Sequence, residues 1–182
     1  MQEIIFIGTI HGFTPIKDLK DIFEKYKPKQ IFVEICQGDI DRNKISQYPK
    51  EMIEAYNWAK KNKIKVKGFD FSANVLVKRK TDEDNKKLIE RQEKIVKKYD
   101  WKKFNKSKFL ELLNKNEDNI VDKDKFRLRQ EKMFENIKKN LTETEITIIM
   151  TGAGHLTFFE SKFPHAIFPL RDYMTGYPRW TN

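Results

Sequence analysis

The stretch that decides the fold is Glu3-Ile-Ile-Phe-Ile-Gly-Thr-Ile-His11, an apolar run that ends in a glycine and a histidine. An unbroken apolar run of this length is typical of a strand buried on both faces, as in a parallel sheet. Residues 30–36 and 64–70 read as two further strands, and helical periodicity fills residues 16–26 and a stretch that starts around Pro49. This alternation predicts parallel strands joined by crossover helices.

After these residues the alternation of strands and helices is interrupted by a long helical stretch and then resumes. Residues 72–141 are charged and helical, and we expect them to form a helical insertion. Strands are then predicted at 145–151 and 166–170, with a helix between them. Thr14 precedes a proline and is expected to cap the first helix. We therefore predict one α/β domain over residues 1–182, with a mostly parallel or mixed central sheet flanked by helices.

Composition limits the function classes. The 182 residues carry a net charge of +10, and residues 78–140 alone contribute +8. Most of the basic residues are Lys, and neither a zinc finger nor a Gly-rich phosphate loop is present, so a nucleic-acid partner is disfavoured. No apolar run reaches the ~20 residues of a membrane span, and the first residues do not resemble a signal peptide. The single Cys36 excludes an internal disulfide, so we expect a cytoplasmic protein; a homo-oligomer is compatible with the sequence.

Two of the three histidines stand in the same local frame. The first strand runs into Gly8-Thr-Ile-His11, and the strand at 145–151 runs into Gly152-Ala-Gly-His155. In an open α/β sheet, ligands bind beyond the carboxyl ends of the strands. The glycines at 8, 152 and 154 let the backbone turn sharply and approach a cofactor or another ligand. We therefore predict that His11 and His155 lie at one site, whereas His165 lacks this frame and is interpreted as structural.

Two carboxylates belong to the same edge of the predicted sheet. Glu34 lies in an otherwise apolar strand, and Asp70 closes the third strand. A buried carboxylate needs a partner or a metal ion. His11, Glu34 and His155 form an open ligand set for a divalent ion such as Mn, Fe, Co or Zn, which would activate a bound water. Asp70 could orient one of the histidines without binding the metal itself, or serve only as a structural or capping residue.

Arg129 is the remaining candidate. It lies on the apolar face of a predicted helix, between Phe126 and Met133, and must pair with a group inside the protein. Glu34, Asp70, a substrate carboxylate and an oxyanion are all suitable partners. A purely structural ion pair between Arg129 and Glu34 is the alternative.

These motifs resemble those of the TraB/PrgY, GumN-like and TIKI-type superfamily, which is related to the erythromycin-esterase/ChaN-like proteins. The similarity rests on Gly8-Thr-Ile-His11, Glu34, Arg129-Gln-Glu-Lys-Met133 and Gly152-Ala-Gly-His155, whose order agrees over nearly the whole chain. Asp70 matches an Asp common in TraB-like proteins, although Phe71 and Ser72 follow it instead of Arg-Pro. The resemblance implies a sheet with helices on both faces and a metal-dependent hydrolytic site.

We therefore expect a metal-dependent hydrolase that acts on a peptide or ester bond of a small-molecule or peptide substrate. In this interpretation His11, Glu34 and His155 hold the metal or act as acid and base, and Arg129 stabilises an oxyanion. The alternative is a non-catalytic ligand- or haem-binding module of the ChaN-like type. We also expect the insertion to form an antiparallel helical layer over the strand ends, with Arg129 on its inner face.

Overall fold

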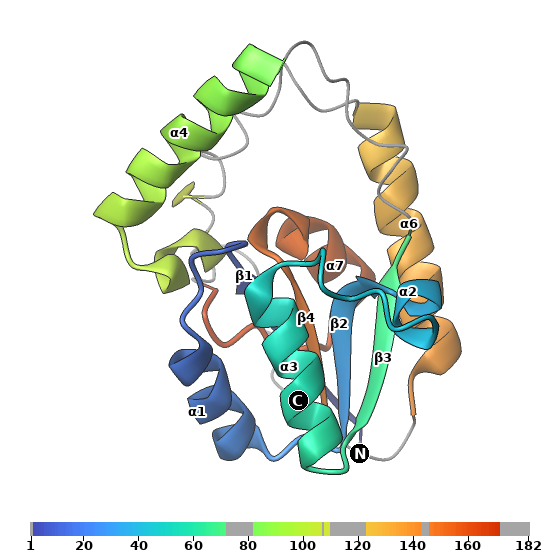
Figure 1. Ribbon diagram of the computed structural model, residues 1–182. Helices are drawn as coiled ribbons and strands as arrows, with labels where there is room; N and C mark the ends of the chain where they lie inside the picture. The colour runs from blue at the N-terminus through green and yellow to red at the C-terminus, as the bar shows by residue number, and fades with distance from the viewer. Residues whose placement is uncertain (1, 72–81, 107, 110–122, 143–145, 172–182) are drawn as a thin grey trace.

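The computed structural model describes residues 2–71, 82–106, 108–109, 123–142 and 146–171, and its core is one parallel sheet (Figure 1). The strands are β1 (Glu3–Thr9), β2 (Gln30–Cys36), β3 (Lys65–Asp70) and β4 (Ile146–Gly152). Their order is β1-β4-β2-β3, and each neighbouring pair is parallel. The predicted α/β fold is confirmed, and all four carboxyl ends lie at one edge of the sheet.

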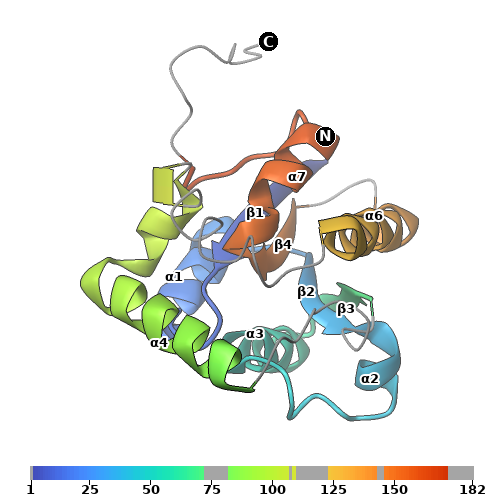
Figure 2. The same ribbon diagram turned by 90° about the horizontal axis from the view of Figure 1, so that it is seen from above.

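Helices cover both faces of this sheet (Figure 2). The described α-helices are α1 (Ile16–Tyr26), α2 (Gln37–Asp41), α3 (Lys50–Lys61), α4 (Asp82–Lys98), α6 (Lys123–Asn140) and α7 (Leu156–Lys162). Two short 3-10 helices, η2 (Trp101–Asn105) and η3 (Ala153–His155), complete the described elements. None of the helices in the described ranges is both long and apolar enough to cross a membrane.

Alternation along the strands divides the core between the two faces. Ile5 and Ile7 of β1 face α1 and α3, whereas Phe6 between them faces α6 and α7. Because both faces are buried, β1, β2 and β4 are apolar at most positions, as the sequence indicated, whereas the edge strand β3 carries Lys65 and Lys67 in its less buried first half. The buried side chains on the α6 and α7 face include a cluster of aromatic rings around Phe6, stacked on Phe159 at 5.1 Å and on Phe168 at 5.0 Å between ring centroids.

The structure corrects the expected last strand. Residues 166–170 form no strand, and a single parallel bridge joins Ile167 to Ile5 at the outer side of β1. The Ile167 N–H donates to Ile4, and its carbonyl accepts from Phe6. Among residues 166–170, Ile167 alone therefore makes the described backbone hydrogen bonds to β1.

The Thr14 cap is a second correction. The N-cap residue of α1 is Pro15, and no side chain caps this helix. The Thr14 hydroxyl instead accepts from the Ile10 N–H at 2.8 Å and donates to the Ile10 carbonyl at 3.2 Å. These bonds close the loop that carries His11, so Thr14 holds the loop rather than the helix.

The insertion also differs from the expected antiparallel layer. Helix α6 packs beside β3, whereas α4 lies on the far side of the strand ends, beyond β1 (Figures 1 and 2). Arg129 does face inward from α6, as predicted, since it contacts buried carboxylates of the sheet. Residues 72–81 and most of 107–122, where further insertion structure was expected, lie outside the described residues.

Candidate active site

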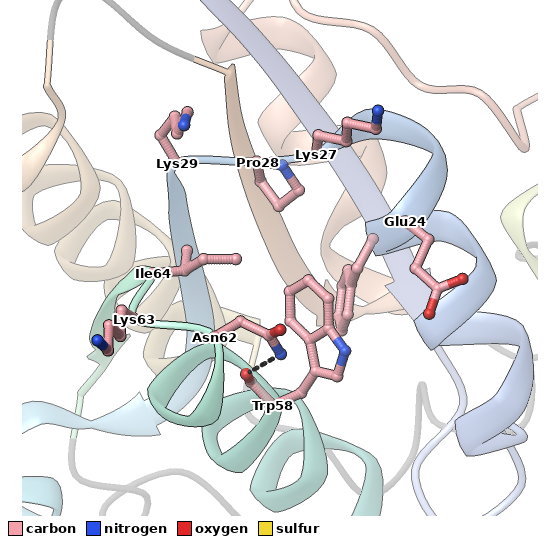
Figure 3. Close-up of a pocket in the computed structure, with 9 residues that line it drawn as sticks. Glu24, Lys27, Pro28, Lys29, Trp58, Asn62, Lys63 and Ile64 are labelled. Atoms are coloured by element: carbon pink, nitrogen blue, oxygen red, sulfur yellow. Dashed lines mark hydrogen bonds between the residues drawn. The ribbon is translucent and has the colours of Figure 1, made fainter.

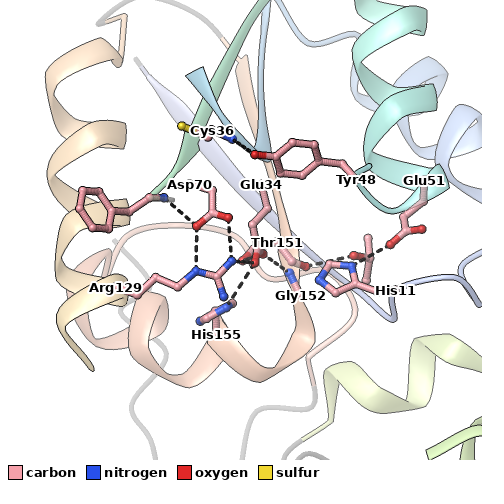
Figure 4. A network of polar contacts seen from close by, with 12 residues as sticks. His11, Glu34, Cys36, Tyr48, Glu51, Asp70, Arg129, Thr151, Gly152 and His155 are labelled. Carbon is pink, nitrogen blue, oxygen red and sulfur yellow. Dashed lines mark hydrogen bonds and ion pairs between the residues drawn. The ribbon is translucent and has the colours of Figure 1, made fainter. Parts of the chain in front are cut away.

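The five residues proposed from sequence meet at the carboxyl edge of the sheet (Figure 4). His11 follows β1, Glu34 lies near the end of β2, Asp70 ends β3, and His155 follows β4 in η3. Arg129 reaches this edge from α6. Every strand of the sheet therefore contributes one side chain, as expected for ligand sites in open parallel sheets.

Arg129 joins two buried carboxylates. Its Nε and Nη2 donate to the two Asp70 oxygens at 2.8 and 2.7 Å, and Nη2 also donates to Glu34 Oε1 at 2.9 Å. The side chains of Glu34 and Asp70 are only 3% and 4% exposed. Burial works to lower the pKa of Arg129, but the hydrogen bond to Asp70 and the charge of Glu34 outweigh it and raise that pKa. Asp70 therefore orients Arg129, and it bonds no histidine among the described residues.

Glu34 is the centre of the cluster. Its Oε2 accepts from the Gly152 N–H at 2.6 Å and from the Thr151 hydroxyl at 2.8 Å. Its Oε1, which already accepts from Arg129, also lies 3.4 Å from His155 Nε2. Burial works to raise the pKa of Glu34, but His155, Arg129 and His11 outweigh it and hold that pKa well below its usual range. Glu34 is therefore a fixed anion with partners on both oxygens.

The predicted glycines have different roles. A Cβ on Gly152 would lie 3.2 Å from His11 Nε2 and 3.6 Å from Glu34 Oε2, so this glycine lets the backbone approach both groups. Gly8 is held by Asn105, whose amide exchanges two hydrogen bonds with the Gly8 backbone at 3.0 and 2.8 Å. A Cβ on Gly154 would meet nothing within 4 Å. The close approaches are to protein groups, and the expected cofactor contact of these glycines stays a prediction.

Glu51 was missed by the sequence analysis. Its Oε1 lies 2.9 Å from His11 Nδ1, and its Oε2 accepts from the Gly12 N–H at 3.2 Å. The Glu51 side chain is 1% exposed, whereas that of His11 is 45% exposed. The sequence does contain a signal, because Glu51 lies four and eight residues before the buried Ala55 and Ala59, on the apolar face of α3.

The charge around His11 favours its protonated form. Burial works to lower the pKa of His11, but the hydrogen bond to Glu51 and the charges of Glu34 and Glu51 outweigh it and raise that pKa above 6.5. Because a carboxylate can only accept, Nδ1 carries the proton in the neutral ring, and Nε2 holds the free lone pair. His11 is thus a base whose tautomer is set by a buried carboxylate.

The segment that leads into α3 is tied to the end of β2. The Tyr48 hydroxyl donates to Asp39 at 2.6 Å and accepts from the backbone N–H of Cys36 at 3.2 Å. This anchor stands three residues before Glu51 and fixes the start of the helix that presents it. Cys36 itself is a half-buried free thiol.

His155 is enclosed on one side by α6. Its ring stacks on Phe126 at 4.8 Å between centroids and 15° between planes. The residue is 5% exposed, and its buried Nδ1 has no partner among the described residues. The two histidines therefore differ: His11 is accessible and His155 is packed.

The predicted metal site does not fit this arrangement. Among the described residues, no group of three His, Cys, Asp or Glu side chains is placed to hold a metal ion. Both Glu34 oxygens already have partners, and a guanidinium stands next to Oε1. His11 directs Nδ1 to Glu51. The expected divalent cofactor stays a prediction, and no step below passes through it.

A surface groove of about 460 Å³ lies at the opposite edge of the sheet (Figure 3). It is lined by Trp58 and Ile64 and by Lys27, Lys29 and Lys63, among others. Both α1 and α3 end here, so these lysines complement the carbonyl ends of two helices. None of the candidate site residues lines this groove.

Comparison with protein-family models, with curated proteins and with solved structures gave no match. The resemblance to the TraB and TIKI-type superfamily therefore stays a prediction, and the functional argument rests on the geometry of the site.

Proposed function

We propose that this protein is a hydrolase of ester or peptide bonds in which His11 is the general base. The observation that carries the proposal is the pair formed by the accessible His11 and the buried Glu51. A carboxylate on Nδ1 fixes the tautomer in which Nε2 can remove a proton, as in the histidine and aspartate of serine hydrolases. Glu51 and Glu34 raise the pKa of His11, which makes its ring a stronger proton acceptor.

The proposed chemical step uses two nitrogen atoms that have no described hydrogen-bond partner, one on His11 and one on Arg129. A water donates a proton to His11 Nε2 while its oxygen attacks the substrate carbonyl, and Nε2–H then returns the proton to the leaving group. The developing oxyanion needs a donor that is not already used. No described residue accepts a hydrogen bond from Nη1 of Arg129, whose other nitrogens hold Glu34 and Asp70. We assign Nη1 to the oxyanion.

The remaining residues act as supports in this proposal. Asp70 and Glu34 fix the guanidinium plane, and Gly152 and Thr151 fix Glu34. His155 packs under Phe126 and holds the other side of Glu34. The substrate in this proposal is a small molecule or a peptide that carries the ester or amide carbonyl.

The experiment is a hydrolysis panel of p-nitrophenyl esters, alkyl esters and short peptides. We expect turnover of at least one class, and a fall in kcat/KM of roughly 10²- to 10⁴-fold in His11→Ala. His165→Ala is the matched control, because His165 is exposed and outside the site; its activity should equal that of the unmodified chain. Saturable binding of haem or another ligand without any turnover would instead favour the non-catalytic carrier, and undiminished activity in His11→Ala would contradict the proposal.

A further inference from the structure

The guanidinium of Arg129 stands where a cation would be expected. A single nitrogen of this group, Nη2, lies 2.9 Å from Glu34 Oε1 and 2.7 Å from Asp70 Oδ2. These two carboxylates come from neighbouring parallel strands, and both are almost fully buried. Two such charges side by side repel each other unless a positive charge lies between them.

A divalent ion would need the same oxygens. Metal–oxygen bonds of about 2.0–2.2 Å require lone pairs that no hydrogen bond already uses. Glu34 Oε2 is taken by Gly152 and Thr151, and Oε1 faces Arg129. A second cation beside the guanidinium would also be repelled, because the site is buried and screening by water is weak.

We infer that Arg129 is the built-in cation of this site, so that its guanidinium and a bound divalent metal exclude each other. The inference concerns how the site is neutralised and holds whether or not the chain proves to be a hydrolase. It predicts that removal of the guanidinium leaves Glu34 Oε1 and Asp70 Oδ2, which now share one nitrogen, as an unneutralised carboxylate pair that a divalent ion can occupy. Carboxylate oxygens are suitable ligands for divalent ions such as Mn²⁺ and Zn²⁺.

The test is calorimetric titration of the metal-free protein with MnCl₂, CoCl₂ and ZnCl₂. Arg129→Ala should bind one equivalent at least roughly tenfold more tightly than the unmodified chain, which should show no saturable site below about 1 mM. Arg127→Ala is the matched control, since Arg127 is an exposed arginine two residues earlier on the same helix; it should behave like the unmodified chain. Glu34→Gln in the Arg129→Ala background should remove the new site.

Two results would overturn the inference. One is a single tight equivalent in the unmodified chain that Glu34→Gln abolishes. The other is a folded Arg129→Ala that binds no ion more tightly than the unmodified chain does. Where Arg129→Ala is unfolded without metal, circular dichroism with and without MnCl₂ replaces the titration: recovery of helix on adding Mn²⁺ supports the inference, and no recovery overturns it.

Discussion

Replacing Glu34 with Ala should lower the free energy of unfolding by about 3–5 kcal/mol, the cost of leaving a buried charge without its partner. The change removes one of two carboxylates that neutralise Arg129, and it leaves the Gly152 N–H and the Thr151 hydroxyl without an acceptor. Buried donors without partners add to the loss. Urea unfolding at neutral pH measures the difference.

A surface ion pair provides the control. Glu131 pairs with Lys162 at 3.0 Å, with both side chains about one third exposed, so Glu131→Ala should cost less than about 1 kcal/mol. Because the pKa of Glu34 is depressed, its contribution is complete above the usual glutamate pKa and is lost as the pH falls through the folded value. The unfolding free energies of the unmodified chain and of Glu34→Ala should therefore converge in strong acid. A loss from Glu34→Ala no larger than that from Glu131→Ala would contradict the description of Glu34 as the centre of the site.

Glu51→Gln should lower kcat roughly 10²- to 10⁴-fold while the fold persists. The amide oxygen must face the Gly12 N–H, which Oε2 accepts at 3.2 Å, so the amide NH₂ is directed at His11 Nδ1. An NH₂ donor there forces the ring proton onto Nε2, which removes the lone pair that takes a proton from water. The variant is nearly isosteric, and the loss is therefore assigned to the tautomer.

The matched control for this change is Glu54→Gln. Glu54 lies one turn later on α3, and the described hydrogen bonds from this helix to the His11 loop are made by Glu51 and not by Glu54. Its substitution should leave kcat unchanged. Equal activity of Glu51→Gln and the unmodified chain, measured on the substrate found by the hydrolysis panel, would show that Glu51 does not set the state of His11.

The sequence predicted the sheet because its signals are local and strong. Apolar runs such as residues 3–7 and 30–36 exceed what an exposed strand would carry. Glycine follows the strands predicted at 3–7 and 145–151, and an acidic residue closes the one at 64–70. The position of Arg129 on an apolar helix face also predicted its inward direction, since a buried guanidinium must be paired.

Partner choice was beyond the sequence, because it depends on strand order. Parallel strands β2 and β3 are neighbours, which places Asp70 beside Glu34 and lets one guanidinium reach both. From spacing alone, a histidine was an equally reasonable partner for Asp70. Glu51 was missed although, like Arg129, it is a charged residue on the apolar face of a helix. Its role as a partner of His11 is visible only once the fold places the His11 loop beside α3.

The errors at the ends of elements share a cause. Thr14 matched the residue type of a helix cap, but its hydroxyl closes the turn with Ile10 instead. Residues 166–170 matched the composition of a strand, but only Ile167 bridges to β1, on the side of β1 opposite β4. Local propensity does not encode which of several competing partners a short segment takes.

The most direct measurement of the central claim is nitrogen-15 NMR of the three histidine rings across a pH titration. For His11 we expect the tautomer with the proton on Nδ1 and a pKa above 6.5, because Glu51 and Glu34 stabilise the charged ring. In Glu51→Gln the proton should move to Nε2 and the pKa should fall. A His11 ring that is protonated on Nε2 in the unmodified protein, or that titrates at or below 6.5, would contradict its assignment as the general base.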